Sequence, residues 1–290
     1  MISFPRKKIR ARTAILLRTK DRPIFLRRAL ESILSQTDQD WAIALVNDGG
    51  DRSELESALL PFSNQLRNKL TVVHFEKSRG RGKGEHLNAG LSAVDSELVA
   101  IHDDDDTWDP NFLAKSRSAM GDQPAVVTQS YLVLEQLKDD LFHEISREIY
   151  EPWQKHGVSL FRLAESLTFP PIALLFRRSV ISSIGPFEDD LGPLEDWEFS
   201  LRLFASFEVV FLEEPLAFYR QRESIGPAGN SRKNQAKIYG ALDQKIRNKL
   251  LREDIASGRM GLGFLVNISQ AHGRLFSELA VGKIANSKRE

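Results

Sequence analysis

The sequence of 290 residues is 41% hydrophobic and 28% charged, which is typical of a globular chain with a large core and excludes a disordered one. Forty basic residues balance forty acidic residues, so no overall charge attracts nucleic acid, and we expect no nucleic-acid partner. The absence of cysteine excludes disulfides, thiolate metal sites and a cysteine nucleophile. We interpret the chain as one α/β body with a helical tail.

The first twelve residues contain five basic side chains, but no uninterrupted apolar segment follows them. We therefore expect no signal peptide. No run of about 18 apolar residues occurs, so we also expect no membrane-spanning helix. Together with the lack of cysteine, these features favour a cytoplasmic protein, with the inner face of the membrane as a second location.

Predicted strands and helices alternate through the first ~110 residues. Short apolar runs predict buried strands at residues 13–17, 41–46, 70–75 and 98–102. Amphipathic segments predict helices near residues 26–34, 55–66 and 87–94. Asp21 is the expected N-cap of the first helix, and Pro23 falls in its first turn. This alternation predicts an α/β fold with a doubly wound parallel sheet flanked by helices.

The second half of the chain predicts fewer strands and ends in helices. Apolar segments at residues 125–134 and 208–212 indicate two further strands. Apolar residues then recur every four positions from Ile238 to Leu250, and residues 264–284 are apolar enough to pack against another surface. We therefore expect residues 232–290 to form a C-terminal helical extension.

Polar clusters follow three of the predicted strands, at residues 18–22, 47–51 and 103–106. Ligands bind beyond the carboxyl ends of the strands in open parallel sheets. The third cluster consists of four consecutive aspartates, whose mutual repulsion a divalent cation relieves, and oxygen ligands suit Mg²⁺ or Mn²⁺. A solvated acidic loop is the alternative. An EF-hand is disfavoured because its alternating aspartates, glycine and closing glutamate are missing. A helix is expected to begin at residues 108–110.

Residues 13–231 resemble the inverting family 2 glycosyltransferases of the GT-A fold. The resemblance rests on the order and spacing of motifs at residues 14–23 (AILLRTKDRP), 46–50 (VNDGG), 87–91 (LNAGL), 101–110 (IHDDDDTWDP) and 192–198 (GPLEDWE). The aspartate motif is the most specific of them. Residues 169–172 (FPPI) resemble the family's acceptor-side loop, although two prolines also set a rigid turn.

The resemblance implies that Thr19 and Asp48 line the nucleoside pocket, with Asp48 accepting a hydrogen bond from the base. Both residues otherwise cap turns. Asp21 and Asp104 are further expected substrate-binding residues. Lys83 closes a loop of basic residues and glycines that either faces the diphosphate or is solvated.

The same resemblance implies roles for the remaining carboxylates. Asp105 is the expected principal ligand of Mn²⁺ or Mg²⁺, and Asp103 lies by the ribose and the metal. Asp196 is the expected catalytic base, with Glu195 beside it and Trp197 in contact with the substrate. The helix dipole also favours carboxylates at this helix N-terminus, and the two interpretations are compatible.

Arg222 occupies the position where family members often have a metal-binding histidine, shortly after a Tyr-Arg pair, here Tyr219-Arg220. A guanidinium stays protonated and cannot coordinate a cation. Arg222 is therefore expected either to contact the diphosphate directly or to face solvent in a shifted loop.

These features predict an inverting, metal-dependent transfer of a hexosyl group from a nucleotide-diphosphate sugar, preferably a UDP-sugar, to an acceptor hydroxyl. The acceptor is a glycan, a polysaccharide, a lipid-linked compound or a small molecule. Residues 1–115 would form the nucleotide-sugar half and residues 116–231 the acceptor and base half of one domain. Alternatives are a sugar-nucleotide-forming nucleotidyltransferase, which normally has a glycine-rich loop that residues 17–21 lack, and a non-catalytic binding protein of the same fold. A hydrolase would need two carboxylates flanking the sugar and no nucleotide pocket.

The helical extension carries seven basic residues and one acidic residue between Arg232 and Arg252. Such a helix either lies on an anionic membrane, which would suit a lipid-linked acceptor, or packs against the body or a second copy of the chain.

Overall fold

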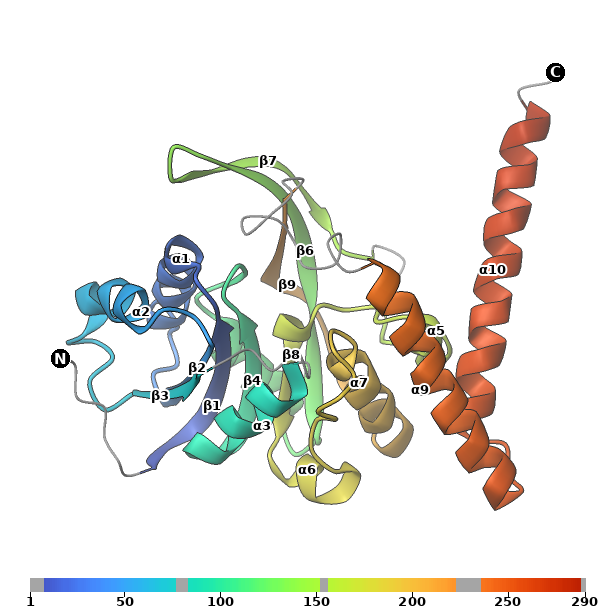
Figure 1. Ribbon diagram of the computed structural model, residues 1–290, viewed down its shortest axis with the longest axis horizontal. Helices are drawn as coiled ribbons and strands as arrows, with labels where there is room; N and C mark the ends of the chain where they lie inside the picture. Colours follow the sequence, from blue (N-terminus) through green and yellow to red (C-terminus); the bar gives the residue numbers. More distant parts are fainter. Residues whose placement is uncertain (1–7, 77–82, 152–155, 223–235, 288–290) are drawn as a thin grey trace.

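The computed structural model describes residues 8–76, 83–151, 156–222 and 236–287. A mixed sheet forms its centre, with the strand order β3-β2-β1-β4-β8-β6-β9-β5 and with β7 paired to β6 (Figure 1). The strands are β1 (Ile9–Thr19), β2 (Trp41–Asp48), β3 (Leu70–Phe75), β4 (Val94–Asp103), β5 (Thr107–Trp108), β6 (Ala125–Lys138), β7 (Leu141–Ile149), β8 (Leu174–Arg177) and β9 (Val210–Gln221).

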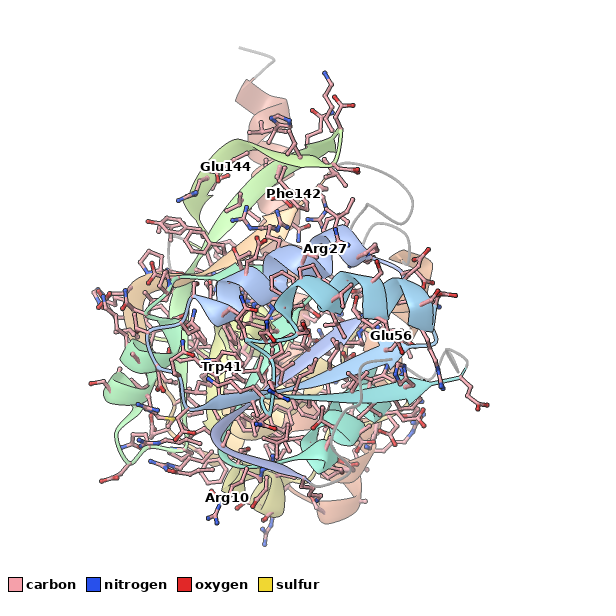
Figure 2. The ribbon with its side chains drawn as sticks, turned by 90° about the vertical axis from the view of Figure 1, so that its left-hand side faces the viewer. Arg10, Arg27, Trp41, Glu56, Phe142 and Glu144 are labelled. Carbon is pink, nitrogen blue, oxygen red and sulfur yellow. The ribbon has the colours of Figure 1, made fainter. Side chains whose placement is uncertain are left out.

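The four strands β3, β2, β1 and β4 are parallel, as the sequence predicts. Helices cover both faces of this part of the sheet: α1 (Pro23–Leu34) and α2 (Arg52–Leu59) lie on one face and α3 (Lys83–Ala93) lies on the other (Figure 2). Strand β2 is consequently buried at all eight positions. A strand covered on both faces needs apolar side chains on both, which explains its continuous apolar run.

Several predicted boundaries are wrong. Asp21 is not the N-cap of α1: the cap is Arg22, and Oδ1 of Asp21 instead accepts a hydrogen bond from the backbone N–H of Asp51 at 2.7 Å. Helix α2 ends at Leu59 and passes into a 3₁₀ turn, η1 (Leu60–Phe62). No helix begins at residues 108–110, because Thr107 and Trp108 form β5 and pair with β9; α4 (Phe112–Met120) follows.

The second half differs most from the prediction. Strand β8 inserts antiparallel between β4 and β6, and β9 is much longer than residues 208–212. Strands β6 and β7 form a long hairpin that reaches over α1, where the rings of Phe142 and Phe25 lie 5.3 Å apart (Figures 1 and 2). The short elements of this half are α5 (Leu160–Glu165), η2 (Pro171–Ala173), α6 (Ser179–Ile184) and α7 (Glu195–Ser206).

The C-terminal extension forms two helices, α9 (Ala236–Ser257) and α10 (Leu262–Ser287). Helix α9 packs on the body, where Lys245 pairs with Asp190 at 2.5 Å and Lys249 pairs with Glu188 at 3.1 Å. These lysines of the basic segment therefore face acidic groups of the body, as the packed-helix interpretation requires. The first part of helix α10 packs against α5, where the buried Ser269 donates to the carbonyl of Phe161, and its later part extends away from the body (Figure 1). Among the described helices, none combines the length and the apolar character needed to cross a membrane.

Candidate active site

The three predicted polar clusters meet at one edge of the sheet. Strand β1 ends at Thr19, β2 at Asp48 and β4 at Asp103. Because these strands are parallel and in register, Thr19 pairs with Asn47 while Arg18 pairs with Asp103. The expected convergence at the carboxyl ends of the strands is thus confirmed.

The four consecutive aspartates alternate between the interior and the edge. Asp104 is buried and accepts hydrogen bonds from the Thr19 hydroxyl at 2.7 Å and from Arg22 Nη1 at 2.8 Å. Asp106 is buried too and accepts the backbone N–H of Arg220 at 2.7 Å. Asp103 and Asp105 are partly exposed. Two of the carboxylates therefore tie neighbouring elements together, and two remain at the edge of the sheet.

Burial raises the pKa of Asp104 to about 6, although the charge of Arg22 acts against it. The pKa of Asp106 also lies well above its usual value because the side chain is buried. Burial has the opposite effect on His102 and lowers its pKa to about 4. The Nδ1–H of His102 donates to the carbonyl of Asp103 at 2.7 Å. A neutral imidazole therefore anchors the start of the aspartate run.

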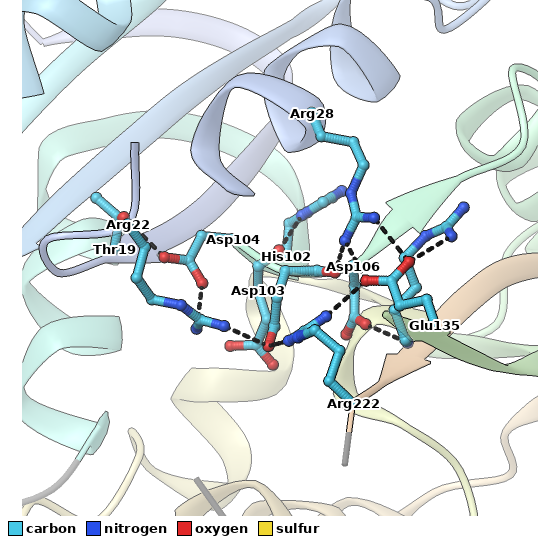
Figure 3. Close-up of polar contacts among 11 residues, drawn as sticks. Thr19, Arg22, Arg28, His102, Asp103, Asp104, Asp106, Glu135 and Arg222 are labelled. Carbon is cyan, nitrogen blue, oxygen red and sulfur yellow. Dashed lines mark hydrogen bonds and ion pairs between the residues drawn. The ribbon is translucent and has the colours of Figure 1, made fainter. Parts of the chain in front are cut away.

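A buried cluster of arginines around Glu135 adjoins the aspartates, and sequence reasoning missed it. Glu135 lies on β6, its side chain is fully buried, and it accepts hydrogen bonds from Arg28 at 2.8 and 2.9 Å, from Arg220 at 3.0 Å and from Arg222 at 2.7 Å (Figure 3). Burial acts to raise the pKa of Glu135, but its arginine partners outweigh this effect and lower it. The sequence signal for this cluster was Glu135 itself, a charged residue directly after the predicted strand at residues 125–134.

Arg222 connects this cluster to Asp105. It is 2% exposed, and its Nη2 lies 2.5 Å from Oδ2 of Asp105, which Arg22 Nη2 also contacts at 2.8 Å. The solvent-facing alternative for Arg222 is therefore wrong. For Arg22, burial alone would lower the pKa, but the charges of Asp104 and Asp105 raise it above its usual value.

The fit of a divalent cation depends on Asp103 and Asp105. Within residues 8–76, 83–151, 156–222 and 236–287, no group of three His, Cys, Asp or Glu side chains forms a complete metal site. Mg²⁺ and Mn²⁺ sites often use one or two carboxylates together with water and substrate phosphates. Asp103 and Asp105 are carboxylates of this kind, but Oδ2 of Asp105 already accepts from Arg22 and Arg222, so an ion there would be bound by the remaining carboxylate oxygens together with water and phosphate.

Asp48 ends β2, on the other side of β1 from Asp103 and the rest of the aspartate run on β4. Its Oδ2 accepts a hydrogen bond from Arg18 Nη1 at 3.0 Å, and its Oδ1 lies 3.3 Å from Nε2 of His86. The turn after β2 is instead capped by Asn47, whose side chain bonds both the N–H and the carbonyl of Gly50. Asp48 is thus not the turn cap, and His86 is a neighbour that the motifs did not predict.

The predicted base lies at the start of α7. Oδ1 of Asp196 accepts the backbone N–H of Trp197 at 2.7 Å, while Trp197 is buried and donates its ring N–H to the carbonyl of Leu163 at 2.7 Å. Glu195 is 1% exposed. A small pocket is lined by Asp103, Glu195 and Asp196 together, so the end of β4 and the start of α7 lie beside one another.

The predicted basic loop falls mostly outside the described part of the chain. Arg79 and Arg81 lie outside the described residues, and the side chain of Lys83 does as well. Lys83 is the first residue of α3, and α3 packs against β1 and β2.

The comparison with known proteins identifies the family. The family described as Glycosyl transferase family 2 matches residues 15–185, more than half of the chain. The amylovoran biosynthesis glycosyltransferase AmsE of Erwinia amylovora is 31% identical over 66% of this chain and 68% of its own length, and the uncharacterized glycosyltransferase alr2836 of a Nostoc strain is 24% identical over 85% and 76%. The chain therefore belongs to glycosyl transferase family 2.

Solved structures agree with the fold. Residues 1–349 of TarS of S. aureus in complex with UDP have a TM-score of 0.59 at 16% identity, covering 84% of this chain and 72% of that TarS chain. The mannosyltransferase PcManGT of Pyrobaculum calidifontis in complex with GDP-Man and Mn²⁺ has a TM-score of 0.57 at 17% identity, covering 95% and 80%. The protein is a glycosyltransferase with the GT-A fold, and the nucleotidyltransferase alternative is set aside.

Proposed function

We propose that this enzyme transfers a hexosyl group from a UDP-sugar to an acceptor hydroxyl with inversion, assisted by Mn²⁺ or Mg²⁺. The observation that carries the proposal is the pocket shared by Asp103 and Asp196. It brings a carboxylate suited to the donor phosphates and a carboxylate suited to proton transfer to one space. The pocket is small, about 10 Å³, so it marks where residues of the two halves come together and does not itself hold both substrates.

The donor half comprises residues 1–115. Asp48 would accept the ring N–H of the base, with Arg18 and His86 holding its carboxylate in place. We take UDP as the nucleotide, as in the TarS complexes with UDP and UDP-GlcNAc; GDP, as in the PcManGT complex with GDP-Man, is the alternative that the experiment below compares. Thr19 would contribute indirectly, because its hydroxyl donates to Asp104 and so orients the start of the aspartate loop.

Asp103 and Asp105 would hold the divalent cation. When bound, such an ion neutralises negative charge that develops on the leaving diphosphate. Arg22 and Arg222 contact Asp105 directly and would lie within reach of the same phosphates. Glu135 would act as a positioning residue, because it holds Arg222 from the side opposite Asp105.

The base half comprises residues 116–231, with Asp196 as the proton acceptor. The acceptor oxygen attacks the anomeric carbon, the bond from that carbon to the diphosphate oxygen breaks, and UDP leaves with the bonding electrons. The proton of the acceptor hydroxyl moves to the carboxylate of Asp196. A single displacement from the face opposite the diphosphate inverts the anomeric configuration. The N-terminus of α7 favours the charged carboxylate that this step requires.

Thermal shift with UDP and GDP, each with and without Mn²⁺, tests the donor half directly. A ligand that binds the folded state raises the melting temperature by mass action. We expect UDP with Mn²⁺ to raise the melting temperature more than UDP alone. In a separate activity assay, we expect the release of UDP from at least one UDP-hexose. Absence of any UDP-dependent shift, with or without Mn²⁺, would contradict the proposed donor.

A further inference from the structure

A second and larger cavity of about 310 Å³ lies beside Asp196, between the body and α9. Cavities that bind small molecules range from roughly 300 to 1,000 Å³, so this one has room for a small ligand. Asp196 and Trp197 contribute to one wall, and Tyr239, Gly240 and Asp243 of α9 contribute to another. The C-terminal extension is therefore part of the cavity and not an appendage to it.

The cavity is rich in flat apolar surfaces. Five aromatic side chains line it, together with prolines of the 169–172 loop; the aromatic residues are Tyr150, Phe169, Trp197, Tyr219 and Tyr239. Aromatic rings offer large apolar faces, and tyrosine adds a hydroxyl that forms hydrogen bonds. Phe169 and Trp197 are buried, so the three tyrosines, which are partly exposed, provide the accessible part of this lining. Tyrosine rings with their hydroxyls match a sugar ring, which has apolar C–H faces and hydroxyls around its edge.

The charged groups of the cavity are all acidic. Glu165, Asp196 and Asp243 are among its lining residues, and no lysine, arginine or histidine is among the described ones. Both oxygens of Asp243 already accept hydrogen bonds, from Arg247 and from Gln270, each at 2.8 Å. An ionised carboxylate only accepts hydrogen bonds, so Asp196 suits a ligand hydroxyl as donor, and its charge repels an anionic ligand. The donor side differs from this cavity, because the arginines that contact Asp105 place positive charge there.

Helix α9 is held firmly in this position. Arg247 is 1% exposed and donates to Asp243 at 2.8 Å, to the carbonyl of Glu165 at 2.7 Å and to the carbonyl of Ala164 at 3.1 Å. Its guanidinium also lies over the ring of Trp197, 4.8 Å from the centroid. Arg247 thus joins α9 to α5 and to the residue that follows the proposed base.

We propose that α9 completes the acceptor site and that this site selects a neutral, uncharged sugar ring as the acceptor. The inference rests on the proposed role of Asp196, because the acceptor hydroxyl must reach that carboxylate. Tyr239 is then a specificity-determining residue, and Asp243 a positioning residue that pairs with Arg247, both on a segment outside the predicted acceptor half. The charge of Asp196 disfavours phosphorylated sugars and uronic acids as acceptors.

Gly240 offers a test that leaves the fold intact. A Cβ atom added at Gly240 would meet no atom within 4 Å, yet the residue lines the cavity. The substitution Gly240→Leu therefore projects a side chain into open space while it improves the helix propensity of α9. The neighbouring Ala241 is exposed and does not line the cavity, so Ala241→Leu is a matched control.

Saturation-transfer NMR with methyl glycosides measures occupancy of the cavity without requiring turnover. The probes are methyl glucoside, methyl galactoside, methyl mannoside and methyl glucuronide, each with the wild type, Gly240→Leu and Ala241→Leu. We expect at least one neutral glycoside to receive saturation from the wild type and from Ala241→Leu, and the signal to be lost in Gly240→Leu. The glucuronide should receive none.

Equal signals in Gly240→Leu, comparable binding of the glucuronide, or no neutral glycoside bound by the wild type would each overturn the acceptor proposal. UDP-dependent thermal shifts on the same samples separate these results from failure of the proposed function. A retained UDP shift with no glycoside signal removes the acceptor site alone, whereas glycoside binding with no UDP shift removes the proposed donor.

Discussion

The Nη2 atom of Arg222 lies 2.5 Å from Oδ2 of Asp105, so a buried guanidinium contacts the carboxylate that we propose as the principal metal ligand. The guanidinium cannot bind a cation but supplies a fixed positive charge beside the proposed diphosphate site. We predict that Arg222→Ala lowers the turnover number by about tenfold or more at saturating Mn²⁺, as loss of a transition-state charge contact typically does.

Arg222→Lys is the control for that variant, because it keeps a positive charge and loses the two-pronged contact with Asp105 and Glu135. It should fall between the wild type and Arg222→Ala. Melting temperatures of both variants separate a folding defect from a catalytic one. Wild-type turnover in a folded Arg222→Ala protein would show that the residue takes no part in the chemistry.

Asp105→Ala should abolish the Mn²⁺-dependent part of UDP binding. An ion held by few protein ligands tolerates the loss of one poorly. Titration of UDP by calorimetry, with Mn²⁺ and with chelator, measures the effect. The exposed Asp122 provides the matched control, Asp122→Ala, which should behave as the wild type. If Mn²⁺ still strengthens UDP binding to Asp105→Ala, Asp105 is not the principal metal ligand.

Glu135→Gln should destabilise the fold by roughly 3–5 kcal/mol, because it leaves three buried arginine contacts without their shared charge. The same change at Glu144, on β7 of the same hairpin, breaks an exposed pair with Arg147 and should cost less than about 1 kcal/mol. Urea unfolding of the two variants gives both values. Equal, small effects would contradict a structural role for the arginine cluster.

The pH dependence of the free energy of unfolding should reveal the lowered pKa of His86. Burial lowers its pKa, so the folded state binds fewer protons than the unfolded state, and the contribution of His86 to stability is lost as pH falls below about 6.5. We expect the wild type to lose stability relative to His86→Asn between pH 7.5 and pH 5.5 in urea unfolding. A constant difference between the two proteins would show that His86 keeps its ordinary pKa.

The sequence predicts the donor side of this fold well, because each part of it is local. Buried parallel strands such as β2 contain continuous apolar runs, and Asp48 and Asp103 end strands of this kind, one residue beyond the apolar run. The arginine cluster is different: Arg28 and Glu135 are 107 residues apart and meet only when the β6–β7 hairpin folds over α1. No local pattern encodes that contact.

The acceptor side shows the same limit. Asp196 is recognisable from its motif at a helix start, whereas Asp243 belongs to a helix whose spacing predicts only that it packs somewhere. Its place in the cavity depends on Arg247, which bonds backbone carbonyls of α5 about 80 residues away in sequence. Every residue has a backbone carbonyl, so the sequence does not indicate which carbonyls Arg247 will bond.

The most direct test of the account is the substitution Asp196→Asn, with Asp122→Asn as the exposed control. The amide oxygen can still accept the N–H of Trp197, so the start of α7 should persist, but the amide cannot take a proton. UDP release from UDP-hexoses and UDP-dependent melting shifts are measured on the same samples. We predict that release falls by about 100-fold or more while the UDP shift is retained. Release within a few-fold of the wild type would contradict the role of Asp196 as the catalytic base.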